Sequence, residues 1–197
     1  VTVFGSAIIL LVNLHVTHGI NKRTFCAYLS TLAGLLLAWG FSVAFVSISK
    51  LSGLGSEEAS LLFLTIDTIK LPSGLLLAGF ILGAVGVLDD IAITQTETVA
   101  ELHKANPKLS SKELYKKAMS IGRHHIASVV NTLVLAYAGV ALPIFLLFAL
   151  REDIGIIRLL NEEMIAEELV RTVSGTMALI LLVPISTYMS ARLFKKK

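Results

Sequence analysis

The chain has 197 residues, of which 55% are hydrophobic and only 16% are charged, with a formal net charge of +3. An ordinary soluble domain has about 25% charged residues, so this composition excludes that class and indicates a polytopic membrane protein. The single cysteine, Cys26, excludes an intrachain disulfide and a cysteine metal cluster.

The apolar residues are clustered in runs close to the roughly 20 residues that a helix needs to cross a bilayer. No Pro/Gly/Ser-rich linker divides the chain. We therefore predict an all-α fold: a polytopic α-helical membrane bundle of about five transmembrane helices, forming a single transmembrane domain over residues 1–197. The expected spans are roughly residues 3–19, 25–48, 72–97, 124–149 and 171–193.

Short amphipathic helices are expected at the membrane surface between the spans. In residues 51–71, Ser56 precedes two glutamates and is predicted to cap a short helix, because acidic residues are favourable in a first turn. In residues 150–170, Asn161 also precedes two glutamates and is predicted to begin a second helix of this kind.

Residues 98–123 form the longest polar stretch and are predicted to be a cytoplasmic loop that contains an amphipathic helix. Asn106-Pro107 should break the chain, and Ser110 with Glu113 has the spacing of a capping box that begins the helix. Since the lysine-rich stretch adjoins membrane spans, its expected partner is anionic membrane lipid, not nucleic acid.

The distribution of basic residues predicts the orientation. Alternate connections and the C-terminal tail carry twelve Lys and Arg residues on one side and five on the other. The positive-inside rule then places the first segment's start outside and the C-terminus in the cytoplasm. Residue 1 is a valine within an apolar run and no basic region precedes it, so no signal peptide is expected. We expect the chain to be the C-terminal part of a longer protein.

Two adjacent carboxylates, Asp89 and Asp90, lie in the apolar segment 72–97 and are the strongest functional signal. A charge inside an apolar span costs at least about 2.5–3.5 kcal/mol on insertion scales, and it usually faces a bundle interior or a wet cavity. Such acids can bind and release a proton or accept a cation. They should face different surroundings, since adjacent helical positions diverge by about 100°. Alternatively, the helix leaves the membrane near Asp89 and both acids are hydrated.

Three further polar residues extend this ion or proton relay hypothesis. Asn131 and Thr132, in the fourth segment, could form hydrogen bonds across to the acids, or they could make a purely structural interhelical bond. Arg123 could gate Asp90, or it could anchor the start of the fourth segment among lipid headgroups.

Gly79, Gly83 and Gly86 form a small-residue face on the acid-bearing segment. The Gly79-x-x-x-Gly83 spacing is typical of close helix packing in membranes. These glycines therefore predict a helix contact and identify no activity.

Catalytic and metal-binding signals are weak or absent in the sequence. His15 and His18 share one helical face, but two histidines without further ligands do not define a metal site. The sequence contains no phosphate-binding loop, nucleophile elbow or zinc-binding histidine motif. We expect no metal, no cofactor and no enzymatic activity.

Three motifs support a family resemblance. They are G-A-x-G-x-x-x-D at Gly83–Asp90, E-L/N-P-x-L-S-x-x-E-L within Glu101–Leu114, and I-G-R…N-T-L-x-L-A-Y-x-G-x-x-L-P at Ile121–Pro143. This stretch resembles the core of the YibE/F-like bacterial membrane proteins, and the flanking segments fit over most of the chain. The resemblance implies a multi-pass protein of the bacterial cytoplasmic (plasma) membrane. Family members are mostly longer, with an additional N-terminal span and an external domain.

A weaker resemblance concerns mechanism. An acid-bearing span, a polar connection and a span similar to R-x-I-x-x-x-x-N-T, here R-x-x-I-x-x-x-x-N-T at Arg123–Thr132, also resemble SecD/SecF-type proteins, in which intramembrane acids relay protons. By analogy, this resemblance implies that Asp89 or Asp90 belongs to a relay and that Arg123–Thr132 lies on the facing helix.

Two functional hypotheses follow. The first is an ion- or proton-coupled transporter or export-related membrane protein that uses its intramembrane acids. The second is a non-catalytic membrane scaffold or accessory subunit, in which the acids only fix helix packing. An odd number of spans favours a homo-oligomer or a partner membrane subunit in either case.

Overall fold

The computed structural model describes residues 1–65, 71–150 and 155–195. Every regular element in these ranges is a helix, which confirms the all-α prediction. The helices are α1 (Thr2–His18), α2 (Lys22–Ile48), α3 (Glu57–Thr65), α4 (Leu71–Ala105), α5 (Ser111–Ala149), α6 (Ile156–Leu160) and α7 (Glu163–Leu193).

Within the described residues, four helices are long and apolar enough to cross a membrane: α2, α4, α5 and α7. They correspond to four of the five expected spans. The remaining one, α1, is an apolar helix of 17 residues, which makes it about 25 Å long at 1.5 Å per residue. That length is below the roughly 30 Å of a hydrocarbon core, so a fifth span remains a prediction.

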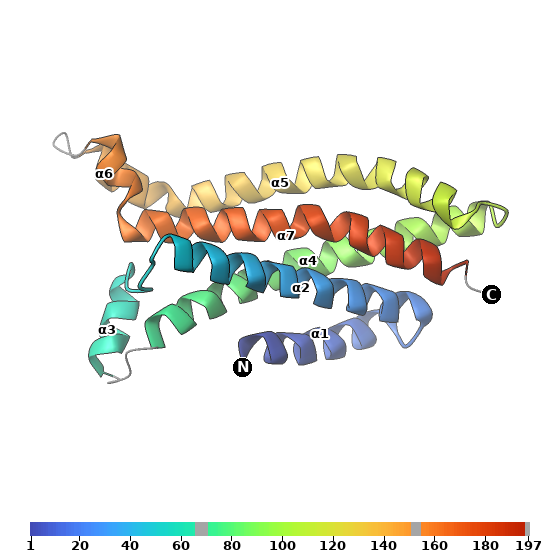
Figure 1. The fold of residues 1–197 in the computed structure, drawn as a ribbon, viewed down its shortest axis with the longest axis horizontal. Coiled ribbons are helices and arrows are strands. Elements are labelled where there is room, and N and C mark those ends of the chain that lie inside the picture. The colour runs from blue at the N-terminus through green and yellow to red at the C-terminus, as the bar shows by residue number, and fades with distance from the viewer. Residues whose placement is uncertain (66–70, 151–154, 196–197) are drawn as a thin grey trace.

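The four long helices run side by side along the length of the molecule (Figure 1). Helix α7 contacts α2, α4 and α5, while α1 packs against α2 and α4. The α1–α2 turn, the α4–α5 turn and the C-terminal end of α7 lie at the same end of the bundle, and α3 and α6 lie at the other (Figure 1). We call the first of these ends the basic end, because it carries Lys22, Arg23, Lys108, Arg192 and Lys195.

The sequence predicts that the α1–α2 turn, the α4–α5 turn and the C-terminal tail share one side of the membrane, and their position at one end of the bundle agrees with this. Four of the counted basic residues, Lys70, Arg151, Lys196 and Lys197, lie outside the described residues, as does the acidic Asp67.

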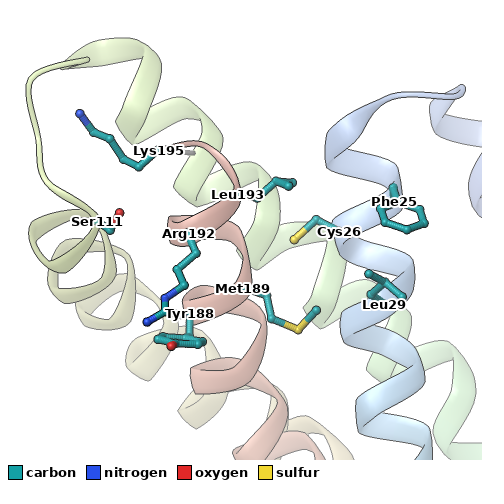
Figure 2. Close-up of a pocket in the computed structure, with 9 residues that line it drawn as sticks. All are labelled: Phe25, Cys26, Leu29, Ser111, Tyr188, Met189, Arg192, Leu193 and Lys195. Atoms are coloured by element: carbon teal, nitrogen blue, oxygen red, sulfur yellow. The ribbon is translucent and has the colours of Figure 1, made fainter. Parts of the chain in front are cut away.

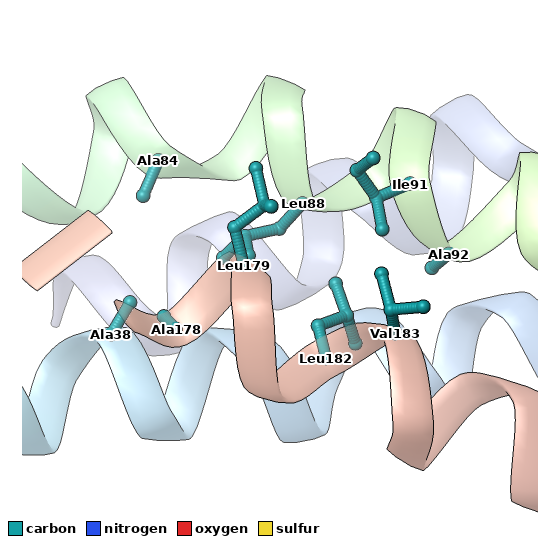
Figure 3. Packing of buried hydrophobic residues seen from close by; sticks show 9 residues of the cluster. All are labelled: Ala38, Ala84, Leu88, Ile91, Ala92, Ala178, Leu179, Leu182 and Val183. Carbon is teal, nitrogen blue, oxygen red and sulfur yellow. The ribbon is translucent and has the colours of Figure 1, made fainter. Parts of the chain in front are cut away.

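The centre of the bundle is a cluster of apolar residues from α2, α4 and α7 (Figure 3). Alanine at several of these positions lets the helices approach closely, as small residues do in membrane bundles. The cluster comprises Ala38, Ala84, Leu88, Ile91, Ala92, Ala178, Leu179, Leu182 and Val183.

Residues 98–123 differ from the expected loop, because they extend two long helices. Helix α4 continues to Ala105, and α5 runs without interruption from Ser111 to Ala149. The break at Asn106-Pro107 is confirmed, and so is the capping box: the Glu113 carboxylate accepts from the Ser110 amide and hydroxyl at 2.8 and 2.7 Å. No helix breaker separates the amphipathic turns from the apolar ones, so they form a single helix.

The starts of the other surface helices were predicted with mixed success. Ser56 caps α3 as expected, because its hydroxyl accepts from the Ala59 amide at 3.2 Å. The prediction for Asn161 is wrong: its side chain donates to the Ile157 carbonyl at 2.7 Å, and Glu162 takes the N-cap position of α7. Helix α7 therefore joins the expected surface helix and the last span into one element.

The first turn of α7 fixes the connection after α2. The Glu163 carboxylate accepts hydrogen bonds from the Ser52 amide at 2.6 Å, the Ser52 hydroxyl at 2.7 Å and the Gly53 amide at 2.9 Å. Gly53 has a φ of 83°, which favours glycine. The Glu163 carboxylate thus stabilises a backbone turn that depends on glycine at position 53.

Replacing Glu163 with alanine is expected to lower the free energy of unfolding by about 2 kcal/mol, since bonds to a charged acceptor contribute about 1.5–3 kcal/mol each when well shielded. Thermal unfolding in lipid nanodiscs measures the change. Glu162→Ala is the matched control, because the Glu162 side chain makes no capping bond. Equal losses in the two variants would contradict this role of Glu163.

Candidate functional site

Asp89 lies on α4 with its residue only 6% exposed, beside the core residues Leu88 and Ile91. The Thr31 hydroxyl of α2 faces it, with Oγ1 at 3.4 Å from the carboxylate. That distance is long for a hydroxyl–oxygen bond, and Thr31 Oγ1 also donates to the Ala27 carbonyl at 3.0 Å. Among the described residues, no basic side chain lies within 4.0 Å of the Asp89 carboxylate.

An ion pair at the basic end gives a reference point for the depth of Asp89 along α4. Arg23, in the first turn of α2, pairs with Glu97 of α4 at 2.8 Å, and it also approaches Glu101 at 3.6 Å. Both side chains of the Arg23–Glu97 pair are about 40% exposed, as expected near a membrane surface. Asp89 precedes Glu97 by eight residues, which places it about 12 Å deeper along the helix.

Asp90 has a different environment. It is exposed on the outer side of α4, about 100° around the helix from Asp89. The structure therefore gives the two acids different surroundings. This difference bears on the alternative that both acids are hydrated at the membrane boundary. Asp89 is enclosed by the bundle, whereas Asp90 faces away from it.

A buried amide joins three helices between Asp89 and the basic end. Gln95 of α4 is 2% exposed, and its Nε2 donates to the Ala118 carbonyl of α5 at 3.0 Å and to the Thr187 hydroxyl of α7 at 2.8 Å. Gly122 makes room for this amide, because a Cβ there would lie 2.9 Å from Gln95 and 2.8 Å from Val183. The absence of a side chain at Gly122 thus permits the hydrogen bonds.

A second polar junction lies one residue further along α4. Thr96 and Ser190 are both buried, and the Ser190 hydroxyl donates to Thr96 Oγ1 at 3.1 Å. The Cys26 sulfur of α2 lies 3.4 Å from the Ser190 hydroxyl. These contacts bring polar side chains of α2, α4 and α7 together inside the bundle.

A small cavity of about 10 Å³ lies between this junction and the Arg23–Glu97 pair. Its volume is close to the smallest that accommodates one water molecule. Polar side chains at its wall could bind that water. The lining residues are Leu14, His18, Arg23, Thr24, Ala27, Ile93, Thr96 and Glu97.

The chemistry of this site is that of one enclosed carboxylate with a single hydroxyl, that of Thr31, beside it. It can hold a proton or a small monovalent cation, because Thr31 leaves most of the carboxylate's hydrogen-bonding capacity unused. Within the described part of the chain, no group of three His, Cys, Asp or Glu side chains is arranged to hold a metal ion.

The other predicted relay residues do not reach the acids. Asn131 and Thr132 lie on exposed parts of α5, and Thr132 Oγ1 donates to the Ser128 carbonyl of its own helix at 3.0 Å. Asn131 follows Gly122, which faces the bundle, by nine residues. Nine steps of about 100° place it on the opposite side of the helix. Arg123 is also exposed and forms no ion pair among the described residues.

The three predicted packing glycines lie along the outer face of α4. A Cβ at Gly79, Gly83 or Gly86 would meet no atom within 4 Å. Within the described chain no helix packs on these glycines, so the contact that their spacing predicts needs a partner outside it.

Sequence reasoning missed Thr31, which faces Asp89, and the partners of Gln95 and Thr96 between Asp89 and the basic end. Thr31 and Ser190 carry hydroxyl groups in apolar segments, where such residues most often bond to their own helix. Gln95 and Thr96 adjoin the acids in sequence, but their partners Thr187 and Ser190 are more than 90 residues away. The sequence signals that could have indicated this helix contact were the amide side chain of Gln95 and the absence of a side chain at Gly122.

The profile of a family described as YibE/F-like protein matches residues 1–196. No curated protein and no solved structure matches the chain significantly.

Proposed function

The chain belongs to the YibE/F-like protein family, and from this premise we propose that it is an ion- or proton-coupled transport protein of the bacterial plasma membrane. In this proposal Asp89 binds and releases the coupling proton or cation. The role is transport and not catalysis of a chemical reaction.

One observation carries the proposal: the Asp89 carboxylate is enclosed by apolar residues about 12 Å from the Arg23–Glu97 pair, with a single long hydrogen bond to Thr31. A charged carboxylate in such a place is costly unless something neutralises it. Among the described residues, no basic side chain lies within 4.0 Å of this carboxylate to form an ion pair with it. A transferable proton or cation meets this requirement, and exchange of that ion would couple Asp89 to a gradient.

The orientation is part of the proposal. Connections at the basic end carry most of the lysines and arginines of the chain, and such connections favour the cytoplasm. We place the basic end, with the C-terminus, on the cytoplasmic side. The polar junction of Thr96 and Ser190 would then lead from Asp89 towards the cytoplasm.

A second candidate function is a membrane scaffold or accessory subunit. The observation that favours it is the outer face of α4, where Gly79, Gly83 and Gly86 meet no other helix of the described chain. Helices pack closely on glycines at this spacing. A second copy of the chain or a partner membrane subunit could cover this face, with or without transport.

Reconstitution into liposomes tests the proposal. Purified protein is placed in liposomes containing a pH-sensitive or a sodium-sensitive dye, and a potassium diffusion potential is imposed with valinomycin, with and without a sodium gradient. We expect proton or sodium entry that is faster than in protein-free liposomes. Entry no faster than in protein-free liposomes under every gradient would contradict transport and favour the scaffold.

A further inference from the structure

A groove of about 520 Å³ opens at the basic end, between the start of α2 and the end of α7 (Figure 2). It lies apart from Asp89. Phe25 and Leu29 of α2 and Met189 of α7 line one part of it, while Tyr188 and Arg192 lie on the side of α7 nearer Ser111 of α5 (Figure 2). Its volume is within the roughly 300–1,000 Å³ range of ligand sites.

The groove has an apolar wall that is open to the surroundings. Phe25 is 54% exposed, Leu29 37% and Tyr188 48%. Because α2 and α7 are both candidate membrane spans, a bilayer around these helices would adjoin this wall. An acyl chain can therefore enter the groove from the side without crossing water.

The other end of the groove is positively charged. The Arg192 guanidinium carbon lies 4.7 Å from the centre of the Tyr188 ring, a distance at which a cation is attracted to an aromatic face. Among the described residues, no carboxylate lies within 4.0 Å of this guanidinium. Its hydrogen-bond donors are thus positioned by Tyr188 while they remain available to an anion.

Lys195 adds a second charge at the same rim. Its Nζ donates to the Pro107 carbonyl at 2.8 Å, which ties the end of the chain to the α4–α5 turn. An ammonium group has three donors, so two remain for a ligand. The two basic residues therefore both line the groove that has this apolar wall.

We infer that this groove binds one anionic glycerophospholipid, with its phosphate at Arg192 and Lys195 and an acyl chain along Phe25, Leu29 and Met189. Basic pockets between membrane helices are suited to anionic headgroups. A soluble anion would use only the charged rim, whereas a phospholipid uses both the rim and the apolar wall. The inference does not depend on the transport proposal.

Native mass spectrometry tests it. The whole protein is released from nanodiscs made of equal amounts of phosphatidylglycerol and phosphatidylcholine, and the retained lipid is identified. We expect one phosphatidylglycerol per chain, and Arg192→Gln should lower its retention by about fivefold, the effect of one basic residue near an anionic surface. Lys116→Gln is the matched control, because Lys116 is exposed near the same end but does not line the groove.

A second variant tests the apolar wall without changing charge. Leu29→Trp should fill the groove and lower phosphatidylglycerol retention, while thermal unfolding and gel filtration verify that the bundle is intact. Equal retention of both lipids, or equal losses in Arg192→Gln and Lys116→Gln, would overturn the inference in favour of general surface attraction. Displacement of the lipid by inorganic phosphate would also overturn it, since the site would then recognise a free anion.

Discussion

Asp89→Asn is expected to lower ion-coupled flux in liposomes by at least about a hundredfold, the lower range for loss of a positioned proton-transfer group. Asparagine has nearly the same shape and can accept the Thr31 hydrogen bond, but it cannot bind and release a proton. It also removes a buried acid that has no described basic partner. The melting temperature should therefore be unchanged or higher, while the flux is lost.

Asp90→Asn is the matched control for this prediction. It makes the same chemical change one residue further on, at an exposed position on the outer face of α4. We expect its flux to remain within about threefold of the original, less than the tenfold that 1.4 kcal/mol produces. If Asp89→Asn instead lowers the melting temperature and activity follows the amount of folded protein, the scaffold hypothesis is favoured.

Gly122→Leu is expected to destabilise the bundle by about 3 kcal/mol, the upper range for overpacking in a well-packed core. The Cβ alone would lie 2.8 Å from Val183 Cγ1 and 2.9 Å from the Gln95 amide. A leucine must therefore displace α5 or break the hydrogen bonds from Gln95 to Ala118 and Thr187. Thermal unfolding in nanodiscs measures the loss.

Gly139→Leu is the matched control on the same helix. A Cβ at Gly139 would meet no atom within 4 Å, and leucine is the better helix former by somewhat less than 1 kcal/mol. We expect its stability to be unchanged or slightly higher. Similar losses in the two glycine variants would mean that helix α5 does not pack through Gly122.

The sequence predicts most of the local features of the fold because their causes are local. The capping box of Ser110 and Glu113, the cap at Ser56 and the break at Asn106-Pro107 each depend on residues within one helical turn. The spans follow from the length of the apolar runs. The lengths of α4, α5 and α7 were not predicted, because polar residues at a membrane surface are compatible with both helix and loop.

The candidate site was predicted only in part because its partners depend on how the helices are rotated. Apolar runs indicate a span but do not fix which side faces the bundle. Asn131 was assigned to the relay from its polarity, yet the rotation that directs Gly122 inward turns Asn131 outward. Thr31 comes from another helix, and its contact with Asp89 depends on how α2 and α4 pack.

The different environments of Asp89 and Asp90 follow in part from helix geometry. Adjacent positions on a helix diverge, so the two carboxylates were expected to face different surroundings, although hydration of both at the membrane boundary stayed an open alternative. Which of them is enclosed depends on the packing of Ala84, Leu88 and Ile91 against α7. That packing places Asp89 inside.

Infrared difference spectroscopy of the protein in lipid nanodiscs tests the central claim, that Asp89 exchanges a proton or a cation. The carbonyl stretch of a protonated carboxyl group is followed while pH and sodium concentration are varied. We predict a band that responds to these changes, persists in Asp90→Asn and disappears in Asp89→Asn. A spectrum in which no such band depends on Asp89 under any of these conditions would contradict the account.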